Sequence, residues 1–176
     1  ALRTRLGQSS DSTNTPASGR QCSMKRRVAR GVSIGANWWK APVGSRCTAM
    51  RADVTVESLQ RQAEEHGWQL FHIDGAKTHD KRSFIRTAGQ ALDFPAYSAQ
   101  NWDAFEESIR DLTWAPAQGY LVLFDEPDQF AASDPEQWAV AREILNTAVK
   151  FHRQQGAPMT VLFRRAGRAL PDIPWL

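Results

Sequence analysis

The chain has 176 residues, 41% of them apolar, so its length suits one globular domain with flanking segments better than two domains. No apolar run reaches the length of a membrane-spanning helix, which argues against a membrane protein. The net charge of +3 is segregated: residues 1–52 carry +9, residues 53–163 carry −8 and residues 164–176 carry +2. The acidic middle favours a basic partner and argues against nucleic acid as the ligand of that segment.

The basic first segment, residues 1–52, is predicted to be a poorly ordered tail. Ser, Thr, Gly, Asn and Arg dominate it, and no helical or strand periodicity persists. The only cysteines, Cys22 and Cys47, lie there, so the rest of the chain has no disulfide framework, which suits a reducing compartment. The residues that follow Met24 lack the apolar core of a signal peptide. We therefore expect a cytoplasmic protein.

Regular structure is expected from Thr55, which can cap a helix that Gly67 ends. Residues 68–74 (WQLFHID) alternate in polarity as a strand does. Asp80 can cap a second helix, and a third helix is predicted over residues 101–114.

The second half of the chain contains two continuous apolar runs, residues 120–124 (YLVLF) and 159–163 (MTVLF), which are typical of buried strands. Between them, Asp134 with Pro135 and Gln137 indicates a strong helix start. The predicted buried residues of this last helix are Trp138, Ala141, Leu145, Ala148 and Val149. Helical crossovers between the strands predict an α/β fold with a three-stranded parallel sheet packed with helices. The domain is assigned to residues 53–165, and residues 166–176 to a C-terminal tail.

The predicted helix over residues 101–114 separates two kinds of side chain. At 100° per residue, its apolar stripe consists of Trp102, Phe105, Ile109 and Leu112. Asp103, Glu107 and Asp111 recur every four residues on the opposite side. Like charges at this spacing cost about 0.2–0.5 kcal/mol per pair, so the acidic stripe is locally unfavourable. A solvated surface and a binding surface both fit this pattern.

The segment FPAYSAQNWDAFEESIRDLTW, residues 94–114, resembles the barstar family. The family pattern is a proline, one or two aromatic residues, a small residue, Asn-(Leu/Trp)-Asp-Ala-(Leu/Phe), and a further acid four residues after the Asp. The matching residues here are Pro95, Tyr97, Asn101, Trp102, Asp103, Ala104, Phe105 and Glu107. The likeness extends over about residues 66–163, and the helix before it resembles an extension seen in some members.

The resemblance implies an inhibitor that binds a bacterial ribonuclease of the barnase type one to one, and not an enzyme. Carboxylates of such an inhibitor occupy the place where the nuclease holds phosphate; barnase and barstar are themselves a familiar example of electrostatic steering. Carried over, Asp103 and Glu107 mimic phosphate, with Glu107 in the nuclease's phosphate site. Tyr97 supplies an aromatic contact before the helix, and Asn101 borders the interface.

Three further positions bear on this interface. Asp111 extends the acidic stripe. Trp114 either anchors the partner, as tryptophans often do, or closes the core beneath the 115–119 loop. The additional acid that the best-known member carries on its last helix falls near Phe151, and Glu107 extends its carboxylate about 1.5 Å farther than an aspartate. A different cognate nuclease is therefore expected.

Other constellations give no sign of catalysis, a cofactor or a metal. The sequence contains no nucleophile elbow, phosphate loop or dinucleotide fingerprint, and its histidines lack ligand spacing. Asp125, Glu126 and Asp128 are interpreted as a solvated acidic loop. Two alternatives stay open: an immunity protein against a different secreted toxin, using the same fold and face, and nucleic-acid binding by the basic ends, which the domain charge of −8 opposes.

Overall fold

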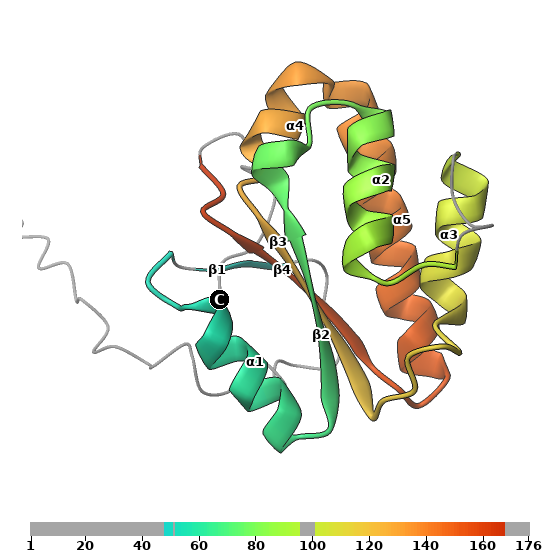
Figure 1. Cartoon of the computed structure of the whole chain (residues 1–176). Coiled ribbons are helices and arrows are strands. Elements are labelled where there is room, and N and C mark those ends of the chain that lie inside the picture. Colours follow the sequence, from blue (N-terminus) through green and yellow to red (C-terminus); the bar gives the residue numbers. More distant parts are fainter. Residues whose placement is uncertain (1–47, 51, 96–100, 168–176) are drawn as a thin grey trace, which may run out of the picture. The chain divides into compact units, whose positions relative to one another are not determined.

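A parallel sheet with helices on both faces makes up the part of the chain that the structure describes, residues 48–50, 52–95 and 101–167 (Figure 1). In this computed structural model the strands are β1 (Thr48–Met50), β2 (Trp68–Asp74), β3 (Gly119–Asp125) and β4 (Met159–Arg164). They lie in the order β1-β4-β3-β2, and every neighbouring pair is parallel. The α/β class and the strands β2, β3 and β4 are confirmed.

The prediction of three strands is wrong, because β1 adds a fourth. β1 lies within the segment assigned to the tail, yet Thr48 pairs with Leu162 of β4 and Met50 pairs with Arg164. All three residues of β1 are buried. A run of three residues is too short to show the alternation that identifies a strand, and the polar residues before it favour a tail.

The helices are α1 (Val56–Glu65), α2 (Lys81–Ala91), α3 (Trp102–Asp111), α4 (Asp128–Ser133) and α5 (Pro135–Gln154), with a short 3-10 turn, η2 (Gly75–Lys77). The caps expected for three of them are confirmed. The side chain of Thr55 accepts a hydrogen bond from Ser58 N–H at 3.2 Å, and Asp80 accepts from Ser83 N–H at 2.7 Å. Asp134 caps α5 in the same way. The six-residue α4 was not predicted, since it is too short to show a helical period.

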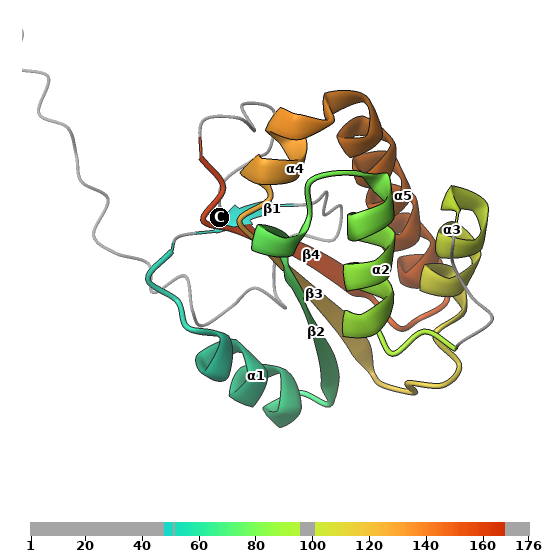
Figure 2. The same ribbon diagram turned by 45° about the horizontal axis from the view of Figure 1, so that its top comes forward.

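The helices divide between the two faces of the sheet (Figure 2). On one face, α1 buries Leu59 and Ala63 against Leu121 of β3 and Leu162 of β4. The other four helices cover the opposite face and enclose the larger core. Every residue of β3 is buried, as expected for a central strand of a parallel sheet covered on both sides.

The larger core holds α3 in place through aromatic side chains. Phe84 of α2 lies 5.4 Å from the ring of Phe105 in α3 and 5.6 Å from that of Phe124 in β3. Trp138 of α5 packs edge-on against Phe124 and Phe163. These contacts pack α2, α3 and α5 against one another and against the sheet, so α3 has a rigid support.

Candidate partner-binding site

Helix α3 begins at a well-formed cap. The side-chain oxygen of Asn101 accepts a hydrogen bond from Ala104 N–H at 2.9 Å, which satisfies one of the free amides of the first turn. Asn101 is exposed, and Asp103 lies in the first turn, where the helix dipole favours a negative charge. The cap thus fixes the start of the helix next to the first acid of the stripe.

The predicted apolar stripe of α3 is confirmed. Phe105, Ile109 and Leu112 are completely buried, while Trp102 is half-buried against Phe84. The indole N–H of Trp102 donates to Gln137 Oε1 at 2.8 Å and so joins the start of α3 to the start of α5. The helix is shorter than predicted: Leu112 adopts a left-handed conformation with φ of 41°, so α3 ends at Asp111.

The opposite side of α3 faces an open hollow of about 700 Å³ that we call the acidic hollow. From α3 it is lined by Asp103, Glu106, Glu107, Arg110 and Asp111, and from other elements by Tyr120, Phe151, His152, Gln155 and Ala157. The three acids of the predicted stripe are exposed, and no residue in the described part of the chain forms an ion pair with any of them. The structure therefore brings these acids together at one hollow.

One cation, Arg110, also lines the acidic hollow. Its Nη1 lies 3.6 Å from Glu106 Oε1, and its guanidinium carbon lies 4.6 Å from the ring centroid of Phe151. The ion pair joins exposed groups and contributes about 0.3–0.5 kcal/mol. The cation–π contact contributes about 0.5–1 kcal/mol at such an exposed position. The ion pair therefore joins Arg110 to Glu106, one turn earlier in α3.

The floor of the acidic hollow contains His152, a buried residue near the end of α5. Its Nε2 lies 2.8 Å from the carbonyl oxygen of Ile109, so this nitrogen carries the proton and donates it. Burial lowers the pKa of His152 below its ordinary value, and the bond to the carbonyl opposes that effect only in part. The neutral imidazole joins α5 to the last turn of α3. No local sequence pattern indicates this role, because the bond depends on a residue 43 positions away.

Two further predicted site residues are Tyr97 and Trp114. Tyr97 lies within residues 96–100, outside the described residues. Trp114 is half-buried; its indole N–H donates to the carbonyl oxygen of Leu92 at 3.1 Å, and its ring meets Phe94 edge-on. Trp114 does not line the acidic hollow as far as the structure describes it. This geometry favours the second of its two interpretations, closure of the core.

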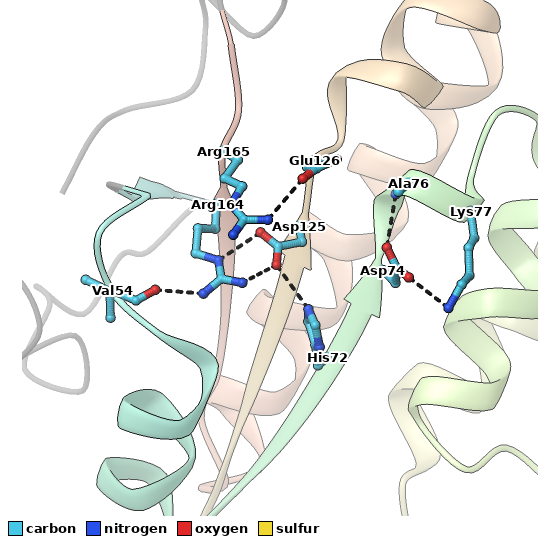
Figure 3. A network of polar contacts seen from close by, with 9 residues as sticks. All are labelled: Val54, His72, Asp74, Ala76, Lys77, Asp125, Glu126, Arg164 and Arg165. Atoms are coloured by element: carbon cyan, nitrogen blue, oxygen red, sulfur yellow. Dashed lines mark hydrogen bonds and ion pairs between the residues drawn. The ribbon is translucent and has the colours of Figure 1, made fainter.

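A second polar cluster lies at the carboxyl ends of β3 and β4 (Figure 3). Arg164 donates to both carboxylate oxygens of Asp125 and, at 2.7 Å, to the carbonyl oxygen of Val54. His72 Nε2 lies 3.2 Å from Asp125 Oδ2. Burial opposes ionisation of Asp125, but the Arg164 guanidinium outweighs burial and holds the pKa of the carboxyl below its ordinary value.

The interpretation of Asp125 as part of a solvated loop is wrong. Asp125 and Arg164 are each 5% exposed, so their ion pair belongs to the interior. The pairing was not visible in the sequence because the two residues are 39 positions apart and meet only through the β3–β4 pairing. Within the described ranges, no group of three or more His, Cys, Asp or Glu side chains is arranged to hold a metal ion. Among the described helices, none is long and apolar enough to cross a membrane.

Comparison with known proteins bears on the whole arrangement. The model of the family described as Barstar (barnase inhibitor) matches residues 68–164, more than half of the chain. The chain belongs to the barstar family. The barstar match begins with β2 and ends with β4, so it contains α3 and the whole acidic hollow, while β1 and α1 precede it. No curated protein in the comparison matches the chain.

Proposed function

We propose that this barstar-family protein inhibits a ribonuclease of the barnase type by placing the acidic hollow against the nuclease's active site. The observation that carries the proposal is the set of three exposed carboxylates, Asp103, Glu107 and Asp111, at one open hollow. They have no ion-pair partner among the described residues, so they are available to the cations of a partner.

The mechanism follows from what a ribonuclease active site must contain. Such a site binds the RNA phosphate through cationic hydrogen-bond donors, and a carboxylate offers them a negatively charged acceptor of similar kind. A carboxylate carries no phosphodiester bond, so the nuclease binds it without a reaction. An inhibitor of this kind needs no catalytic group of its own.

The rigid support of α3 favours binding of the nuclease by the carboxylates of this helix. The Asn101 cap and the bond from Trp102 to Gln137 fix the start of the helix, and the buried His152 fixes its end. Because the helix is ordered before binding, little conformational entropy is lost when the partner arrives. The backbone positions of the acids are therefore preorganised toward the nuclease.

We assign the central role to Glu107. It lies midway along the acidic stripe, one turn from Asp103 and one turn from Asp111. Residues at the centre of an interface lose the most water and carry the largest share of the binding energy. In the proposed complex Glu107 enters the phosphate site of the nuclease, with Asp103 and Asp111 beside it.

Titration of barnase with the full chain tests this proposal, with cleavage of a fluorogenic RNA as the measurement. We expect cleavage to fall linearly and to stop at one inhibitor per nuclease. Glu143→Gln removes one exposed carboxylate from α5 outside the acidic hollow. This control variant is expected to inhibit as the wild type does. Undiminished cleavage in the presence of a molar excess of the chain would contradict the proposal.

A further inference from the structure

Arg110 is a cation in a hollow whose other charged residues, among those that the structure describes, are acids. The hollow otherwise carries Asp103, Glu106, Glu107 and Asp111, so a basic partner approaching it meets one like charge among four opposite ones. The position of this cation is specific. Its guanidinium lies over the Phe151 ring at 4.6 Å and beside Glu106 at 3.6 Å.

Phe151 and Glu106 together offer what a cation needs for binding. A flat aromatic face attracts a guanidinium or ammonium group, and an adjacent carboxylate pairs with its charge. Both groups belong to the rigid helices α5 and α3, and Phe151 is held between solvent and the core. In the free protein the chain's own Arg110 fills this position.

We propose that Phe151 and Glu106 form a cation subsite of the acidic hollow, and that Arg110 is a built-in occupant which an arginine or lysine side chain of the partner displaces. The proposal rests on the proposed function only for the identity of that partner. Arg110 is suited to displacement because its side chain is 43% exposed. Rotation about its own flexible bonds moves it into solvent without any shift of α3.

This arrangement gives Arg110 a role in specificity. A nuclease that presents a cation opposite Phe151 displaces Arg110 and gains the contacts with the Phe151 ring and the Glu106 carboxylate. A nuclease that presents no cation there leaves Arg110 in place, facing the positive surface of the partner, and the like charges weaken the complex. Arg110 therefore selects among basic partners that the acids alone would bind equally.

A tetra-arginine peptide provides a direct test that needs no nuclease. We would titrate it into the full chain and follow the ring resonances of Phe151 by NMR. Arg110→Ala is expected to tighten the binding monitored at Phe151 by about fivefold, because the competing cation is gone. Arg86→Ala is the matched control: it makes the same change in net charge on the exposed side of α2, outside the acidic hollow.

A second variant tests whether the Phe151 ring binds the cation. In the Arg110→Ala background, Phe151→Leu is expected to reverse most of the gain, since leucine keeps the apolar character but lacks the aromatic face. Because this variant has no Phe151 ring to follow, its peptide affinity is measured from the backbone amide resonance of Glu106, which is followed in every variant. Urea denaturation of each variant verifies that the fold is intact. Equal peptide affinities for Arg110→Ala and Arg86→Ala would overturn the proposal, as would a Phe151 ring signal that responds to the peptide neither in the wild type nor in Arg110→Ala.

Barnase inhibition tests the proposed function, and peptide binding tests the cation subsite, so the two can fail separately. If the wild type inhibits barnase but Arg110→Ala and Arg86→Ala bind the peptide equally, the cation subsite is wrong and the inhibitory function stands. If barnase is not inhibited but Arg110→Ala binds the peptide more tightly than Arg86→Ala does, the subsite stands and the function is wrong.

Discussion

Asn101 is the single residue on which the start of α3 most depends, because its side chain makes the cap of the helix. Asn101→Ala is expected to lower the free energy of unfolding by about 1 kcal/mol. Asn101→Asp keeps the cap, so it is expected to stay within about 0.5 kcal/mol of the wild type. Urea denaturation measures both. Equal loss in the two variants would show that the cap is not the source of the effect.

Asp125 carries a buried charge that is paired with Arg164. Asp125→Asn leaves the buried Arg164 without its counter-charge, and we expect it to lower the free energy of unfolding by about 3 kcal/mol at neutral pH. Because the pKa of Asp125 is lowered in the folded protein, its contribution is complete above the ordinary aspartate pKa and is lost as the pH falls through the folded value.

The pH dependence separates this ion pair from other effects of the substitution. The stability difference between wild type and Asp125→Asn is expected to be constant near neutral pH and to shrink below about pH 4. Urea denaturation of both proteins across this range provides the measurement. A difference that stays the same down to about pH 2.5 would contradict an ionised Asp125 in the fold.

At the scale of elements, the joint between α3 and α5 supports the candidate site, and His152 lies in it. Because burial lowers the pKa of His152, the unfolded chain takes up a proton at a higher pH than the folded protein does. The stability that His152 contributes is therefore present above the ordinary histidine pKa of about 6.5 and is lost as the pH falls below it.

His152→Gln tests the joint, because glutamine can still donate to the Ile109 carbonyl but does not titrate. At neutral pH we expect the free energy of unfolding of the variant to be about 1–3 kcal/mol lower than that of the wild type, because packing and hydrogen bonding are altered. We also expect it to lose less stability than the wild type between about pH 7.5 and 5.5. An identical pH profile for both proteins would show that His152 is not held neutral by the fold.

The elements differ in how far local sequence determines them. The start of α2 and the start of α5 were predicted because Asp80 and Asp134 cap them within four residues. The apolar stripe of α3 was predicted for the same reason, since its period is local. Strand β1 was missed because only its pairing with β4, more than a hundred residues later, makes three residues into a strand.

The site shows the same division between local and distant contacts. The acidic stripe follows from the spacing of α3, so the shared exposed side of Asp103, Glu107 and Asp111 was predicted from the sequence, while their role in binding stays a prediction. The contact of Arg110 with Phe151 joins two helices, and no pattern in either helix indicates it. Contacts of this kind depend on the tertiary packing of α3 against α5.

At the scale of the whole molecule, charge governs how a partner arrives. In the proposed encounter, the net charge of −8 over residues 53–163 attracts a basic nuclease to that part of the chain, although the full chain carries +3, and dissolved salt screens such attraction. We expect the association rate with barnase to fall by about tenfold or more between 0.05 and 0.5 M salt, as in the steered associations of which barnase and barstar are the familiar example. The dissociation rate is expected to change much less.

Stopped-flow mixing of the full chain with barnase measures the association rate at each salt concentration. The control is Glu143→Gln, whose loss of one distant carboxylate is expected to leave the slope nearly unchanged. An association rate that does not depend on salt would show that the acidic surface plays no part in the encounter.

In the proposed complex the acidic hollow, with Glu107 at its centre, blocks the active site of a ribonuclease. The most direct test compares the inhibition constants of the wild type, Glu107→Gln and Glu143→Gln for barnase. Glutamine keeps the size of the side chain and removes its charge, so Glu107→Gln is expected to weaken inhibition by about tenfold to a hundredfold. Glu143→Gln is expected to inhibit as the wild type does. Equal inhibition by the two variants would show that the Glu107 carboxylate does not enter the phosphate site of the nuclease.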